Sequence, residues 1–350
     1  MGLNMRHRLF ALPVLVLALA LLGVDTKAQV RDHDTHAAVV SATVVPSELV
    51  AERPPPPDPL AGMHIVSSPD RVADLVVLVS IDGLRADAVT PSHHALARLR
   101  TEGTWATNAM TIRRSTTLPS HASMVTGVDM PVHGMEWNTY RPQMGPVRFP
   151  TIFRVARMAG LETTMIVGKN KLRHLVDAGG AETFTLAGRG CDGIVTRASH
   201  ALRTHGPGIL FLHFADPDSA GHRRGWMSPT YLDAVTRADA CTERVMRELA
   251  ARPHGTERVL LIVTADHGGH QRSHGSALEV DRRIPWYAWG GAAFPEARIA
   301  RTVTTQDTAA TVLAALGLPQ TPGIEGRPVF EALRYGNAGA VPPVRRRHGR

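Results

Sequence analysis

The stretch DLVVLVSID, residues 74–82, places an acidic residue directly after a run of mostly aliphatic side chains. A short apolar run of this kind is typical of a strand that is buried on both faces of a parallel sheet. The same pattern returns in three later stretches, which are TTMIVG (163–168), GILFLHFAD (208–216) and RVLLIVTAD (258–266). The four stretches therefore predict the centre of a parallel sheet.

Helical patterns lie between the predicted strands and after them. They are SHHALARLRTEG (92–103), SPTYLDAVTRADACTERVMRELAARP (228–253) and TQDTAATVLAALG (305–317). Ser92 is placed to cap the first helix, and Gly103 and Gly317 are residues that end helices. Strands that alternate with helices predict an α/β fold, with a mostly parallel central sheet sandwiched between helices.

The two ends of the chain differ in composition from this core. Residues 1–28 combine two early arginines, an apolar run and small residues, which is the layout of a secretory signal peptide. Pro-rich residues 29–71 predict a linker, and residues 336–350 predict a basic, disordered tail. The folded domain is expected at 72–335 of a periplasmic or secreted protein, and an uncleaved membrane anchor is the alternative for the N-terminal run.

The charge of the chain, +8 at neutral pH, does not by itself indicate a partner. No basic patch is interleaved with aromatic residues, so specific nucleic-acid binding is not expected. Membrane contact is expected only through an uncleaved N-terminus or the basic tail. Two cysteines, Cys191 and Cys241, allow one disulfide in an exported protein, with two free thiols as the alternative. The sequence leaves the oligomeric state open.

Three of the four predicted strands end at an acidic residue: Asp82, Asp216 and Asp266. In open α/β sheets, functional sites form outside the carboxyl ends of the strands, so these carboxylates are expected at one edge. Close together and shielded from water, they would repel one another and lose hydration. The arrangement therefore predicts a bound cation.

More side chains that suit a metal site follow these strand ends. They are Asp218 and His222 after the third strand, and His267, His270 and His274 after the fourth. Aspartate and histidine without cysteine are the ligands of a hydrolytic zinc or manganese site. They are too many for one tetrahedral ion, and two bridged ions are the standard arrangement for phosphoryl transfer. Thr116 and Thr117 precede a short predicted helix, whose N-terminus suits an anion, and a threonine hydroxyl there suits a nucleophile.

Five segments together resemble a known family. They are LVSIDGLRAD (78–87), STTLPSHASMVTG (115–127), PVHGMEWN (131–138), DPDSAGH (216–222) and TADHGG with SHG (264–269 and 273–275). Their order and spacing are similar to the motifs of the type I phosphodiesterase/nucleotide pyrophosphatase family, in the alkaline phosphatase superfamily. The resemblance covers roughly residues 74–334. It implies an alkaline phosphatase-like fold and a two-metal hydrolase of phosphoric esters, which the signal-peptide pattern predicts to be exported.

The resemblance also implies roles for individual residues. One zinc ion would be surrounded by Asp82, Thr117, Asp266 and His267, and the second would be held by Asp218, His222 and His274. Manganese is the alternative metal. Thr117 would attack the phosphorus of a small phosphate ester and form a covalent phosphothreonine intermediate. The backbone N–H of Thr117 and the side chain of Asn138 would bind a phosphoryl oxygen.

The remaining histidines of these motifs are expected to bind no metal. His270 has the spacing from His274 of a helical zinc pair, but the two glycines that precede His270 oppose a helix there. His121 and His133 are expected to have structural or supporting roles.

Other activities and two residue assignments remain open. Sulfatases of the same superfamily have the pattern Cys/Ser-x-Pro-x-Arg where this chain has TLPSH (117–121), which argues against sulfate esters. Phosphomonoesterases and phosphotransferases are harder to separate, because a threonine nucleophile serves monoesters and diesters alike. Among the residues, Thr116 could replace Thr117 as nucleophile, and Asp216 could replace Asp218 as ligand.

Overall fold

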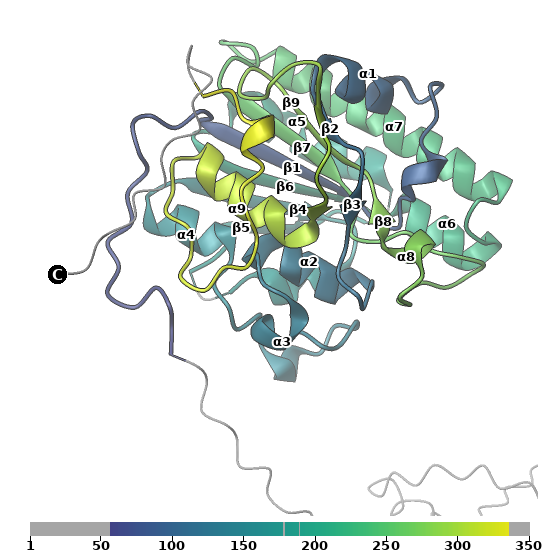
Figure 1. Ribbon diagram of the computed structural model, residues 1–350, viewed down its shortest axis with the longest axis horizontal. Helices are drawn as coiled ribbons and strands as arrows, with labels where there is room; N and C mark the ends of the chain where they lie inside the picture. The colour runs from purple at the N-terminus through teal and green to yellow at the C-terminus, as the bar shows by residue number, and fades with distance from the viewer. Residues whose placement is uncertain (1–56, 178, 189, 336–350) are drawn as a thin grey trace, which may run out of the picture. The chain divides into compact units, whose positions relative to one another are not determined.

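The computed structural model describes residues 57–335, apart from residues 178 and 189 (Figure 1). The predicted signal peptide, the linker up to residue 56 and the basic tail lie outside the described residues. Residues 57–71, which the sequence assigns to the linker, lie against the domain. Leu60 and Ile65 are buried, and Ser67 donates a hydrogen bond to the carbonyl of Leu316. The packed part of the chain therefore begins before residue 72.

The domain is built on an eight-stranded sheet in the order β10-β2-β9-β7-β1-β6-β4-β5, beside a small sheet of β11, β3 and β8. The strands are β1 (Leu75–Ile81), β2 (Thr104–Ala106), β3 (Ala109–Met110), β4 (Glu162–Val167), β5 (Thr183–Leu186), β6 (Gly208–Phe214), β7 (Val259–Thr264), β8 (Arg283–Ile284), β9 (Trp286–Trp289), β10 (Ala297–Ile299) and β11 (Val303–Thr304). The four predicted strands are β1, β4, β6 and β7. They run parallel to their neighbours, except where β7 meets the antiparallel β9.

Helices cover both faces of the large sheet. They are α1 (His94–Glu102), α2 (Thr117–Thr126), α3 (Met130–His133), α4 (Ile152–Met158), α5 (Cys191–Thr204), α6 (Asp216–Arg224), α7 (Pro229–Ala250), α8 (Glu279–Arg282) and α9 (Thr305–Ala315), with short 3₁₀ turns η1 (Ala86–Ala88), η2 (Pro142–Met144), η3 (Asn170–Leu175) and η4 (Phe330–Ala332). α2, α4 and α9 lie over one face, and α1, α5 and α7 lie over the other (Figure 1). The predicted α/β sandwich is confirmed. Within the described part of the chain, no helix has the length and apolar character that a membrane span requires.

The central strands form from residues that suit burial on both sides. Every residue of β1, β6 and β7 is buried. Burial of each aliphatic side chain contributes about 1.5–3 kcal/mol, so the hydrophobic runs are stable only where helices cover both faces. This requirement places the strands in the middle of the sandwich.

Local capping sets the ends of the long helices. Ser228 accepts a hydrogen bond from the backbone N–H of Tyr231 at the start of α7, and Pro229 occupies its first position. A cap at Ser92 predicts that α1 starts at residue 93, but the helix starts one residue later, at His94. The N-cap residue is His93, and the Ser92 hydroxyl instead lies 2.7 Å from the hydroxyl of Thr90.

The parallel register brings the carboxyl ends of β1, β6 and β7 to one edge of the sheet. Asp82 directly follows β1, and one residue, Ala265, separates Asp266 from the end of β7. Gly83 lets the chain turn there with a φ of +73°, a conformation that favours glycine. A Cβ at Gly83 would lie only 2.9 Å from the Cα of Asp218, so the absence of a side chain also allows these two segments to meet.

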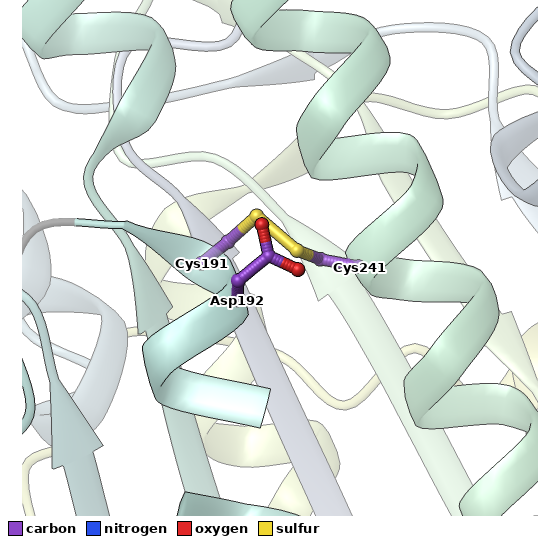
Figure 2. Close-up of side chains that lie close together, drawn as sticks. All are labelled: Cys191, Asp192 and Cys241. Carbon is purple, nitrogen blue, oxygen red and sulfur yellow. A yellow bond between two sulfur atoms is a disulfide. The ribbon is translucent and has the colours of Figure 1, made fainter. Parts of the chain in front are cut away.

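A disulfide between Cys191 and Cys241 joins the start of α5 to the middle of α7 (Figure 2). The bond links positions that are 50 residues apart in the chain. The carboxylate of Asp192 lies beside the two sulfur atoms, but sulfurs that are bonded to each other are not thiolate ligands. Of the two states that the sequence leaves open, the structure has the disulfide.

Candidate active site

The first cluster of polar side chains lies at the ends of β1 and β7. Asp82, Asp266 and His267 are completely buried. The Nε2 atom of His267 is 3.4 Å from Oδ1 of Asp82 and 3.3 Å from Oδ2 of Asp266. Neither of these two carboxylate oxygens has a hydrogen-bond partner among the described residues.

Thr117 borders this cluster as the first residue of α2. Its hydroxyl oxygen is 3.3 Å from Nε2 of His267. His121, one turn along the helix, lies 2.7 Å through its Nδ1 from the carbonyl of Thr117 and contacts the Ser80 hydroxyl through Nε2. Burial lowers the pKa of His121 well below its usual value, so the ring is neutral and fixes the helix start on the sheet.

The second cluster combines two residues of α6 with one residue of the loop after β7. Asp218 and His222 are four residues apart and face the same way on the helix. Oδ1 of Asp218 is 3.3 Å from Nε2 of His222 and 3.5 Å from Nε2 of His274. This oxygen also has no hydrogen-bond partner among residues whose positions are described.

The three histidines of these clusters present the same nitrogen to the carboxylates. Nδ1 of His267 contacts the carbonyl of Gly268, and the Nδ1 atoms of His222 and His274 contact the carbonyls of Arg272 and Ser115, all at 2.8–3.0 Å. A carbonyl only accepts, so each Nδ1 carries the proton. Burial lowers the pKa of His267 and of His274, so these two rings are neutral and their Nε2 lone pairs face the unpartnered carboxylate oxygens. The contact with Asp218 raises the pKa of His222.

This arrangement sets acceptor against acceptor in two places. Such contacts are unfavourable unless a cation or a proton lies between the atoms. A histidine that binds a metal usually donates its other ring N–H to a carbonyl or carboxylate, as these three do. The two clusters therefore fit metal ions in both donor type and orientation.

Lys169 connects the two clusters. Its Nζ atom lies 2.7 Å from Oδ2 of Asp82 and 2.5 Å from Oδ2 of Asp218. His213, completely buried in β6, contacts the same Asp82 oxygen at 2.9 Å through Nε2. Both contacts occupy the Oδ2 atoms and leave Oδ1 of each aspartate free to face the histidines.

The pKa shifts show that one lysine does not balance three carboxylates. Burial disfavours the charged form of Asp82, but the Lys169 ammonium and His213 outweigh it and hold the pKa of Asp82 well below its usual range. Burial and the negative charge of Asp82 raise the pKa of Asp266 well above its usual range. Burial lowers the pKa of His267 to about 3, so this ring is neutral. Further positive charge beside these residues would stabilise the ionised form of Asp266.

A cavity of about 960 Å³ opens beside the second cluster, and Asp218 and His222 are part of its wall. Thr117, Asn138, Lys171 and His274 are among its lining residues. Oδ1 of Asn138 accepts from the backbone N–H of Leu118 at 2.9 Å and from Nζ of Lys171 at 3.0 Å. These bonds orient the amide, and its NH₂ group remains available to a ligand oxygen.

The alternative residues make contacts of other kinds. Asp216 accepts from the backbone N–H of Cys191 at 2.9 Å and so caps α5. Thr116 occupies the N-cap position of α2, before Thr117. His270 lies 2.7 Å from Asp281 through its Nδ1 atom, in a segment that is not helical. His133 contacts the Ser123 hydroxyl at 3.0 Å inside the fold.

Sequence reasoning missed three residues of this region: Lys169, Lys171 and His213. The two lysines follow β4 in the stretch GKNK, at the same sheet edge as the aspartates. The strand-end rule applies to them as well, although they do not share the acidic pattern. His213 is the single ionisable residue within the apolar strand β6, which is a detectable signal.

The sequence of this chain matches the model of a known protein family. The model of the family described as type I phosphodiesterase/nucleotide pyrophosphatase matches residues 76–156 and 168–287. Human ectonucleotide pyrophosphatase/phosphodiesterase family member 7 is 29% identical over 220 residues, which cover 55% of this chain and 47% of the relative. The chain thus spans about half the length of the curated relatives that it matches.

Solved structures share the fold at low sequence identity. Murine ectonucleotide pyrophosphatase/phosphodiesterase 5 superposes with a TM-score of 0.60 at 14% identity, over 73% of this chain and 97% of that one. A 2-O GAG sulfatase superposes with a TM-score of 0.62 at 13% identity, over 74% of this chain and 73% of that one. The fold alone therefore does not separate phosphate from sulfate chemistry.

Replacement of Lys169 tests the charge balance of the site. In protein treated with a chelator, Lys169→Gln is expected to lower the free energy of unfolding by about 3–5 kcal/mol, because it leaves buried carboxylates without their cation. Lys171→Gln is the matched control, since its Nζ donates to the amide oxygen of Asn138 and pairs with no carboxylate among the described residues. A loss below about 1.5 kcal/mol is expected for this variant. Urea unfolding measures both values, and equal losses would contradict this account.

Proposed function

The chain belongs to the type I phosphodiesterase/nucleotide pyrophosphatase family, and on this basis we propose that it is a metal-dependent hydrolase of phosphoric ester bonds that prefers diesters. The observation that carries the proposal is the pairing of unpartnered carboxylate oxygens with histidine Nε2 atoms in two adjacent clusters. The second cluster lines the cavity beside Thr117, and the Thr117 hydroxyl lies 3.3 Å from His267 of the first cluster. A nucleophile beside two candidate metal sites suits phosphoryl transfer.

The proposed metal ions are two zinc ions, with manganese as the alternative. Asp82, Asp266, His267 and Thr117 would hold the first ion, and Asp218, His222 and His274 would hold the second. Aspartate and histidine donors, with no thiolate in either cluster, support this choice. Metal ions at these positions supply positive charge for the phosphoryl oxygens and lower the pKa of nearby hydroxyl groups.

Thr117 is the proposed nucleophile. Its oxygen would form a bond to phosphorus as the bond to the leaving-group oxygen breaks, which gives a phosphothreonine that water then hydrolyses. The hydroxyl lies at the N-terminus of α2, where the helix dipole favours negative charge. The murine structure provides further support, because it is of an inactive threonine-to-alanine variant in complex with AMP.

Asn138 is proposed to position the phosphoryl group together with the backbone N–H of Thr117. The contacts of its Oδ1 with Leu118 and Lys171 hold the amide in place before substrate binds. Donors that are already oriented stabilise developing charge without reorganisation in the transition state. The proposed substrate is a small phosphate ester, and the leaving group is not specified by these contacts.

Export to the periplasm or the exterior is part of the same proposal. The signal-peptide pattern of residues 1–28 supports it. The Cys191–Cys241 disulfide also supports it, because such bonds persist in oxidising compartments. No specific nucleic-acid partner is proposed.

A matched pair of variants tests the nucleophile. Thr117→Ala is expected to lower kcat for bis-p-nitrophenyl phosphate by about 10³-fold or more while about two zinc ions stay bound, because it removes the attacking oxygen. Thr116→Ala changes the neighbouring hydroxyl and is expected to keep most of the activity. Wild-type turnover by Thr117→Ala would disprove the assignment, and a loss confined to Thr116→Ala would transfer it to that residue.

A panel of three p-nitrophenyl esters tests the substrate class. The phosphate diester is expected to have a higher kcat/KM than the phosphate monoester, and the sulfate ester the lowest. Steady-state release of p-nitrophenol measures all three with the same leaving group. Preference for the monoester would instead indicate a phosphomonoesterase, and preference for the sulfate ester would overturn the proposal.

A further inference from the structure

A second cavity of about 720 Å³ lies between α1, α8 and the β2–β9 side of the sheet. Its volume is within the range of small-molecule sites in proteins. The walls are mostly apolar and include Val89, Leu96, Trp105, Val280, Ile284 and Tyr287. It shares no lining residue with the cavity that contains Thr117.

Arg100 is the charged group of this cavity that has no counterion. Its guanidinium carbon lies 4.0 Å from the centroid of the Trp105 ring. Asp87 forms an ion pair with Arg85, and Glu279 forms one with Arg283. Arg100 forms no ion pair with any carboxylate in residues 57–177, 179–188 and 190–335. The wall therefore has one positive charge that an anionic ligand could neutralise.

Tyr287 provides a hydrogen-bond donor beside this charge. It pairs directly with Trp105 in the antiparallel ladder of β2 and β9, so both side chains lie on the face of the sheet that α1 covers. The side chain lines the cavity and the residue is 7% exposed. Its hydroxyl has no hydrogen-bond partner among the residues that the structure describes. Burial raises the pKa of Tyr287 to about 12, so the hydroxyl keeps its proton at neutral pH.

We propose that this cavity binds an amphipathic organic anion. The apolar body of the ligand would lie against Leu96, Val280 and Ile284. Its anionic group would lie between the Arg100 guanidinium and the Tyr287 hydroxyl. The proposal concerns binding only and does not depend on the reaction at Thr117.

A cationic or a purely apolar ligand fits these walls less well. A cation would meet Arg100 without a free carboxylate, since Asp87 and Glu279 are already paired. An apolar molecule would shield the Tyr287 hydroxyl from water without replacing its hydrogen bond, which is unfavourable. An anion on an apolar body satisfies both groups and also covers the apolar wall.

Fluorescence titration with 8-anilinonaphthalene-1-sulfonate tests the proposal on the full-length protein. One saturable site is expected in the wild type. Arg100→Gln is expected to weaken binding about tenfold and Tyr287→Phe about threefold, because each removes one contact to the sulfonate. N-phenyl-1-naphthylamine, which has the same body without the sulfonate, is expected to bind more weakly and to be insensitive to Arg100→Gln.

Arg98→Gln is the matched control on the same helix. Arg98 is paired with Glu102 and Glu243 and does not line the cavity, so wild-type affinity is expected. Inorganic phosphate, a probe for the Thr117 cavity, is expected not to displace the dye. The proposal is overturned by equal affinities in wild type, Arg100→Gln and Tyr287→Phe, by equal losses in Arg98→Gln and Arg100→Gln, or by displacement with phosphate. Thermal unfolding of each variant verifies that the dye reports on folded protein.

Discussion

The mutual repulsion of three buried carboxylates is the constraint on which the rest of the site depends. Asp82, Asp218 and Asp266 meet at one edge of the sheet because β1, β6 and β7 are parallel and in register. Lys169 and His213 bind one oxygen of Asp82, and Lys169 also binds one oxygen of Asp218. The remaining oxygens face histidine lone pairs. The arrangement therefore favours a cation at this edge of the sheet.

The backbone supports this arrangement through contacts from several segments of the chain. Carbonyl groups of Ser115, Gly268 and Arg272 orient the three histidine rings. Gly83 allows α6 to approach the end of β1 closely enough for Asp218 to reach the site. The fold is shared with a sulfatase at similar TM-scores, so these local contacts and the residues at the start of α2 must determine the chemistry.

Much of the fold could be predicted because burial leaves a clear pattern in the central strands. β1, β4, β6 and β7 are apolar runs, and the acidic residues after β1, β6 and β7 indicated the edge where the site lies. Short strands such as β3 and β10 have two and three residues and carry no such pattern. Their pairing depends on the chain around them, so no local signal identified them.

The site was predictable where the residue type itself suggests a ligand, and less so where a contact determines the role. His270 and His274 are the same residue type, and the sequence separates them only through the glycines before His270 and the family resemblance. The contact of His270 with Asp281 shows the role that the sequence could not give. The role of Lys169 is likewise determined by its contacts and not by its residue type. A lysine after a strand is unremarkable in sequence, and its importance follows from the two carboxylates that the fold places beside it.

Anomalous diffraction at the zinc edge, from crystals of the protein grown with zinc, tests the central claim most directly. Two peaks are predicted, one among Asp82, Asp266 and His267 and the other among Asp218, His222 and His274. A map with no peak at this edge of the sheet under saturating zinc would contradict the claim that the carboxylates are held there to bind cations.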